Sequence, residues 1–134
     1  MTVEMHNVTF DCADARKLAD FWAALLGWSV FHDDDPEVVV APSFPTRGLG
    51  LLFIPVPEGK TVKNRLHLDV APTDCTRDEQ VEQAIALGAA IHEDHRNEDG
   101  TGWVTMTDPE GNEFCIERST VEKGGPQRGV FRLG

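Results

Sequence analysis

The feature that most constrains this chain is an internal repeat, in which the second half echoes the first at an offset of 58 to 61 residues. Phe-Asp-Cys-Ala followed by Asp at 10–14 corresponds to Leu-Asp-Val-Ala followed by Asp at 68–74, and Leu26-Gly27 corresponds to Leu87-Gly88. Each copy alone would leave one face of its sheet uncovered, so two copies are needed to bury or curl those faces. We therefore expect an α+β fold of two βαβββ modules that form a curved mixed sheet.

The first module is expected at about residues 5–56. Asp14 can cap a helix that runs to Leu26, and Gly27 can end it in the left-handed conformation. The apolar stripe of this helix follows the spacing i, i+3, i+4, i+7 at Leu18, Phe21, Trp22 and Leu25. Strands are expected at 8–13, 28–31, 37–41 and 50–54, with an acidic turn at 33–35.

The second module is expected at about residues 63–118. Thr76 and Glu79 have the spacing of a capping box for a helix that ends at Gly88. Asp108-Pro-Glu-Gly111 predicts a tight turn between strands at 103–107 and 112–117, because proline presets φ at its second position. Further strands are expected at 65–70 and 89–92. Residues 1–134 are expected to form one domain, with a linker at 55–60 and a C-terminal tail at 119–134.

Charge and composition narrow the partners. Twelve basic and 23 acidic residues give a net charge of −11 without a basic block. Nucleic acids and anionic membrane surfaces require clustered Lys and Arg, so we expect a neutral or cationic small-molecule ligand. The acidity can also serve solubility alone. Three cysteines without CxxC spacing, no secretory signal and no apolar run of about 20 residues predict a cytoplasmic protein without disulfides or membrane spans.

Three motifs, at residues 14–28, 63–69 and 108–115, resemble the glyoxalase-like branch of the vicinal-oxygen-chelate superfamily. The resemblance covers residues 5–118 and implies a small-molecule lyase, isomerase or oxygenase that forms a homodimer. A second reading is a metal-free ligand-binding protein that sequesters a cationic drug, as the bleomycin-resistance members do. A third reading is a scaffold that keeps the cup for regulation. Fold does not fix function, so these readings remain open.

The resemblance also implies a divalent metal held by His and Glu side chains from both modules. The matching positions here are Asn7 or Thr9, the segment 51–54 without a carboxylate, His67, and Cys115 in place of the usual Glu. A catalytic metal normally takes about three protein ligands. We therefore assign no metal ligands and leave the cofactor open.

His67 and Asp69 are the candidate catalytic residues. Strand alternation is expected to direct them to the same side as Arg65, and an Asp beside a His can fix its tautomer and raise its basicity. The alternative is a structural polar row at the interface between the modules.

The candidate ligand-binding residues come from both modules. Cys115 is either a reactive thiol or a small buried hydrophobe. His92 and His95 have a spacing that would put them on opposite faces of a strand, which predicts a surface role. The full set of candidate ligand-binding residues is Arg65, Thr9, Phe53, Trp103 and Cys115.

Overall fold

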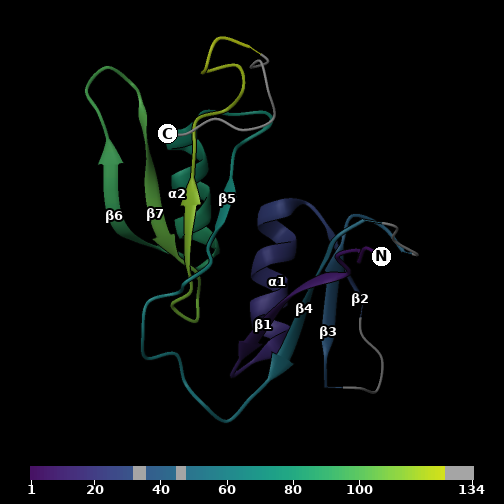
Figure 1. The fold of residues 1–134 in the computed structure, drawn as a ribbon. Coiled ribbons are helices and arrows are strands. Elements are labelled where there is room, and N and C mark those ends of the chain that lie inside the picture. The colour runs from purple at the N-terminus through teal and green to yellow at the C-terminus, as the bar shows by residue number, and fades with distance from the viewer. Residues whose placement is uncertain (32–35, 45–47, 126–134) are drawn as a thin grey trace. The chain divides into compact units, whose positions relative to one another are not determined.

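The computed structural model describes residues 1–31, 36–44 and 48–125, and it divides into two compact units at residues 1–61 and 62–134 (Figure 1). The acidic turn expected at 33–35 and the end of the tail lie outside the described residues. Neither helix in the described ranges combines the length and the apolar character needed to span a bilayer.

The first unit is a four-stranded mixed sheet with one helix. Its strands lie in the order β1-β4-β3-β2, with β1 parallel to β4 and the other neighbours antiparallel. The elements are β1 (Asn7–Cys12), α1 (Ala15–Leu26), β2 (Ser29–Phe31), β3 (Val38–Ala41) and β4 (Gly50–Pro55).

Helix α1 forms where the sequence predicts it. The side chain of Asp14 accepts a hydrogen bond from the Lys17 amide at 3.1 Å, and Gly27 ends the helix at a φ of 69°. Leu18 and Trp22 from the apolar stripe are almost completely buried, and Phe10 packs against the Trp22 ring. The helix therefore supplies the core of the first unit, while its polar side faces outward.

The second unit has the same topology. Its strands lie in the order β5-β8-β7-β6, with β5 parallel to β8 and the other neighbours antiparallel. The elements are β5 (Leu68–Val70), α2 (Arg77–Leu87), β6 (Ala90–Arg96), β7 (Gly102–Thr107) and β8 (Glu113–Ile116). Two mixed βαβββ sheets with one helix each confirm the predicted α+β class and the duplication.

Two strand boundaries in the second unit differ from the sequence prediction. The expected strand at 65–70 begins only at Leu68, because the chain bends at Arg65 and Leu66. The expected strand at 89–92 runs on to Arg96, since β6 pairs with β7 along its length. The predicted acidic loop is therefore part of a strand.

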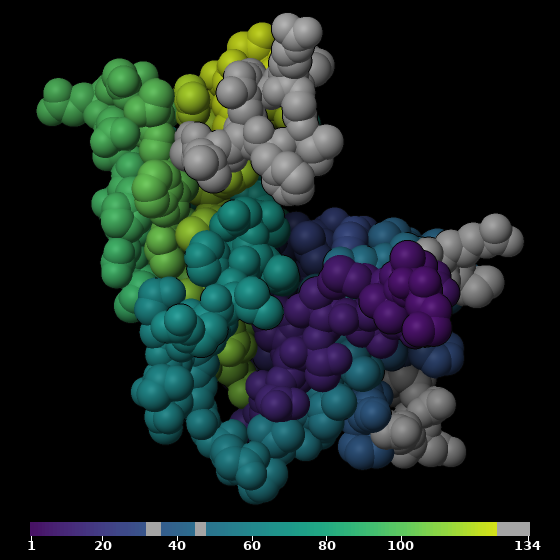
Figure 2. Space-filling view, viewed as in Figure 1, coloured from purple at the N-terminus to yellow at the C-terminus, as the bar shows by residue number. Residues whose placement is uncertain are grey.

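Strand β6 is an edge strand of its sheet, and residues 90–94 are exposed. This part of the chain is the green surface at the margin of the second unit in Figure 2. Its charged side chains suit an edge, because they oppose pairing with a further strand.

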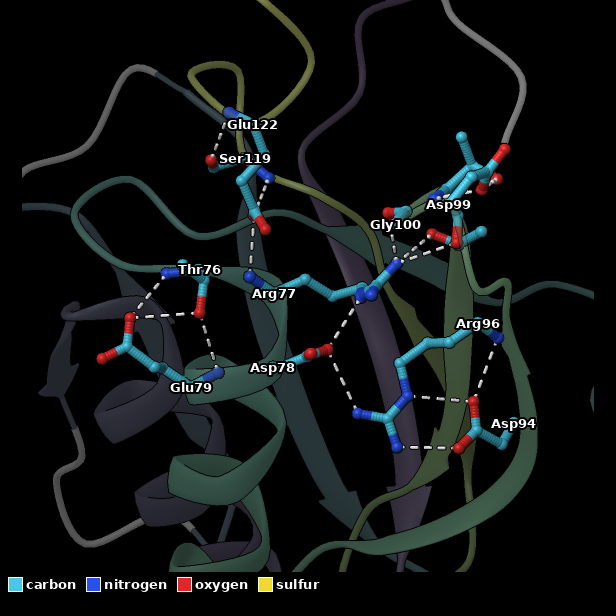
Figure 3. A network of polar contacts seen from close by, with 12 residues as sticks. Thr76, Arg77, Asp78, Glu79, Asp94, Arg96, Asp99, Gly100, Ser119 and Glu122 are labelled. Carbon is cyan, nitrogen blue, oxygen red and sulfur yellow. Dashed lines mark hydrogen bonds and ion pairs between the residues drawn. The ribbon is translucent and has the colours of Figure 1, made fainter.

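A buried arginine holds the turns of the second unit together (Figure 3). The Arg77 guanidinium donates to the carbonyls of Gly100, Thr101 and Gly102 at 3.1 Å each, and its side chain is only 6% exposed. The Arg77 amide donates to Glu122 Oε1 at 2.7 Å, so the start of α2 is also tied to the segment after β8. Buried carbonyls that lose such a donor destabilise a fold strongly.

We expect Arg77→Met to lower the free energy of unfolding by about 2 to 4 kcal/mol, because three carbonyls lose a charged donor. The matched control is Arg16→Met, since Arg16 is exposed and pairs with Asp20 one helical turn away at 3.1 Å. The control should cost less than about 0.5 kcal/mol. Urea unfolding measures both, and equal costs for the two variants would contradict the structural role of Arg77.

Candidate functional site

A cavity of about 320 Å³ opens on the sheet of the second unit. Alternation along β7 buries Val104 and Met106 completely and leaves Trp103 and Thr105 half buried, lining the cavity. A cavity of this size can hold a small molecule. The site therefore lies on the sheet face that α2 does not cover.

One row of side chains crosses all four strands at the base of the cavity. Glu93 on β6 is paired in register with Thr105 on β7, which is paired with Cys115 on β8, which is paired with Asp69 on β5. Residues opposite one another on neighbouring strands project from the same face. The register therefore places carboxylate, hydroxyl and thiol groups side by side.

His67 joins this row from the residue before β5. Its Nδ1 lies 3.4 Å from Asp69 Oδ1 and 3.9 Å from Cys115 Sγ, and Thr105 Oγ1 lies 3.5 Å from the same sulfur. The His67 and Asp69 side chains are 42% and 52% exposed, so a ligand can reach both. The predicted pair of His67 and Asp69 is thus in contact inside a cavity.

The Cys115 thiol is held in its protonated form. Burial raises the pKa of Cys115, and the negative charge of Asp69 raises it further, against a smaller lowering by the hydrogen bond with Thr105. A reactive cysteine needs a lowered pKa. The environment of Cys115 therefore opposes spontaneous thiolate chemistry.

The prediction that His92 and His95 lie on opposite faces is wrong, since both line the cavity. The ladder between β6 and β7 shifts register between Ile91 and Glu93, which is the mark of a β-bulge. The extra residue changes the side to which His92 points. Sequence spacing alone cannot reveal a bulge.

Glu93 lies between the two histidines. Its Oε2 is 2.9 Å from His95 Nε2, and its Oε1 is 3.8 Å from His92 Nε2. The His95 ring stacks on its cross-strand neighbour Trp103 at a centroid distance of 4.7 Å and an interplanar angle of 27°. Trp103 thus presents an aromatic surface within the cavity, as the sequence suggested.

The other candidate ligand-binding residues lie apart from this cavity. Arg65 is exposed on the bend before β5 and is not among the lining residues. Thr9 is exposed on β1, and Phe53 is completely buried in β4 against the Phe10 ring, both in the first unit. Lys63, Glu113 and Glu117 line the cavity and complete its charged wall.

The first unit offers an internal comparison for the cluster. At the repeat offset, Asp69 and its neighbour Cys115 correspond to Asp11 and Ile54, which are also paired in register. Thr9 stands where the second unit has His67. The fold therefore forms without a His–Cys pair at these positions, so the cluster is not a requirement of the topology.

The metal site implied by the family resemblance does not fit the residues present. Leu51 and Phe53 are buried apolar side chains on β4, and Thr9 on β1 offers only a hydroxyl group. Of the positions matched in the sequence, only His67 carries a usual ligand. No step of the chemistry below is routed through such an ion.

Comparison with protein-family models matches residues 7–117 to the glyoxalase-like domain, so the chain belongs to the glyoxalase-like domain family. The expected membership of the vicinal-oxygen-chelate superfamily is thereby confirmed. The curated proteins contain no match to this chain.

Solved structures with this fold share little sequence with the chain. A glyoxalase/bleomycin resistance protein/dioxygenase family enzyme from Burkholderia phytofirmans is 17% identical, with a TM-score of 0.65 over 85% of this chain and 97% of that one. A fosfomycin resistance protein from Mesorhizobium loti is 13% identical, with a TM-score of 0.65 over 92% and 98%. A glyoxalase-related enzyme from Fulvimarina pelagi is 16% identical, with a TM-score of 0.61 over 85% and 86%. At these identities the likeness shows the fold alone.

We expect Gly102→Ala to disrupt the β6–β7 pairing that positions His95 on Trp103. A Cβ at Gly102 would lie 2.0 Å from the His95 carbonyl oxygen, and the φ of 94° is strained for alanine. Gly100→Ala is the control, because it has a similar φ of 89° but open space around the Cβ. Chemical unfolding should show a loss for Gly102→Ala that exceeds the control by about 2 kcal/mol or more. Equal losses would contradict the close approach.

We expect Cys115 in the folded protein to react with iodoacetamide at pH 7.5 at least about tenfold more slowly than in the urea-unfolded chain. The raised pKa keeps the thiol protonated, so its rate should climb with pH beyond the range of an ordinary thiol. Peptide mass spectrometry follows each cysteine separately. Rapid modification of Cys115 at neutral pH would show that the site stabilises the thiolate.

Proposed function

We propose that this protein is a small-molecule enzyme of the glyoxalase-like class, a lyase, isomerase or oxygenase, that binds its substrate in the cavity of the second unit. The observation that carries the proposal is the contact of His67 Nδ1 with Asp69 Oδ1 at 3.4 Å within a cavity large enough for a ligand. Histidine paired with a carboxylate is a common arrangement for proton transfer.

His67 would contact the reacting atoms, and Asp69 would orient it. The carboxylate favours the tautomer with the proton on Nδ1, which leaves the lone pair of Nε2 able to accept a proton from a bound substrate. The negative charge of Asp69 would also stabilise the imidazolium that forms. The alternative role of His67, as a ligand through Nδ1, uses the same neighbours.

The charges of the cavity favour a polar substrate that is neutral or carries a positive group. Among the lining residues that the structure describes, one lysine faces four carboxylates, on Asp69, Glu93, Glu113 and Glu117. Complementary charge raises the local concentration of a cationic ligand. Lys63 could meet one anionic group of the substrate at the rim.

A metal-free sequestering protein is the second candidate function. Trp103 supplies an aromatic face, and stacked rings beside carboxylates suit the binding of a cationic aromatic drug. Tight binding of a cationic glycopeptide without any turnover would favour this function over catalysis. The homodimer and the cytoplasmic location stay predictions, and light scattering of the purified protein tests the first.

We expect His67→Gln to weaken binding of the native small-molecule ligand by about tenfold or more, since it removes a direct contact worth at least 1.4 kcal/mol. The ligand is identified by native mass spectrometry of the purified protein and then titrated by calorimetry. Because His67 is well exposed, the melting temperature of the free variant should stay within about 2 °C of the parent.

The matched control is His6→Gln. His6 is also an exposed histidine near a carboxylate, 4.0 Å from Glu4, but it lies in the first unit. This variant should bind the ligand as the parent does. A large fall in melting temperature for His67→Gln, with ligand affinity retained, would return His67 to a structural polar row.

A further inference from the structure

We propose that His67, Asp69 and Cys115 together form a binding site for a thiophilic divalent metal ion of the Zn²⁺ type, built within the second unit alone. The inference rests on the proposed function, because it concerns the same cavity and assigns His67 the role of ligand. It differs from the ion implied by the family resemblance, since both its residues and its donor atoms are different.

The distances suit one shared ion. The ligand atoms of the three side chains all lie within 4.8 Å of one another, with Nδ1 to Oδ1 at 3.4 Å and Sγ to Nδ1 at 3.9 Å. Bond lengths to tetrahedral Zn²⁺ place neighbouring N, O and S ligands roughly 3.3 to 3.6 Å apart. Small side-chain movements would bring all three atoms to bonding distance.

The backbone fixes two of the three ligands. Asp69 and Cys115 are register partners on the parallel strands β5 and β8, so their side chains leave the same face of the sheet. His67 is two residues before Asp69 and returns its ring to that pair. The hydroxyl of Thr105 lies 3.5 Å from the sulfur and can hold its orientation as an outer partner.

The donor atoms select the class of ion. One imidazole, one carboxylate and one thiol match borderline-soft ions such as Zn²⁺ or Co²⁺, whereas Mg²⁺ and Ca²⁺ prefer oxygen ligands alone. Three protein ligands leave a fourth position for water or substrate, and the half-exposed His67 and Asp69 side chains place that position toward the cavity. An ion on Nδ1 takes the place of the proton there, so the metal-bound and proton-accepting roles of His67 exclude each other.

The two histidines of β6 provide a control within the same cavity. His92 and His95 both lie against Glu93, at 3.8 and 2.9 Å, rather than in the group of three ligand atoms. A metal held by the proposed site should therefore not depend on them. Cys75 gives a second control, because it is a thiol outside the cavity.

The test is a Co²⁺ titration of the reduced, chelator-treated full chain, followed by absorption spectroscopy and competition with Zn²⁺. We expect one ion per chain, a thiolate-to-cobalt charge-transfer band in the near ultraviolet and visible bands of a tetrahedral ion. Changes to outer partners cost 10- to 100-fold in affinity, so Cys115→Ser should abolish the charge-transfer band and weaken Zn²⁺ binding by about 100-fold or more. Bound Zn²⁺ should also protect Cys115 from alkylation.

Two further variants keep the test decisive if Cys115→Ser fails to fold. Asp69→Asn changes a half-exposed side chain and should weaken Zn²⁺ binding while circular dichroism stays that of the parent. The double variant His92→Gln, His95→Gln and the variant Cys75→Ser should both bind Co²⁺ with the parent's spectrum.

The site is overturned if the parent chain shows no charge-transfer band, or if the band survives Cys115→Ser and disappears in Cys75→Ser. Absence of metal binding with retained binding of the small-molecule ligand would leave the proposed function standing, with His67 as the proton acceptor. Metal binding together with ligand binding that is insensitive to His67→Gln would instead sustain the metal site and reject the proposed function.

Discussion

The parallel pairing of β5 with β8 is the constraint on which the candidate site depends. It brings residues 67–69 beside Cys115, although more than 40 positions separate them in the chain. The pairing can form because α2 and the β6–β7 hairpin occupy the connection, and parallel neighbours require such a crossover. A shift of one residue in this register would turn Cys115 toward the core and leave His67 and Asp69 without their third neighbour.

The two sheet faces of the second unit have opposite chemistry, and each makes the other possible. Val104, Met106 and Phe114 are buried completely or almost so, and Arg77 holds the adjoining turn through three carbonyls. This stability allows the other face to carry clustered carboxylates and imidazoles that contribute little to folding. Polar groups that are held by a rigid scaffold lose little entropy when they bind a ligand.

Comparison of the two copies separates the requirements of the fold from those of the site. Both copies use the same strand order and both helices have a cap at their start and a glycine at their end. At the paired positions, however, the first copy has Asp11 and Ile54 where the second has Asp69 and Cys115. The backbone pattern is satisfied by either pair, so the polar cluster is best explained by what it binds.

The sequence by itself determined the duplicated topology, both helices and the contact between His67 and Asp69. These follow from local rules, because caps, turn glycines and the alternation of side chains act over only a few residues. Only the tertiary structure decided that Cys115 meets this pair, that β6 continues to Arg96, and that a bulge brings His92 and His95 to the same cavity. Register and bulges depend on hydrogen bonds between strands that are distant in sequence, and such bonds leave no local pattern to read.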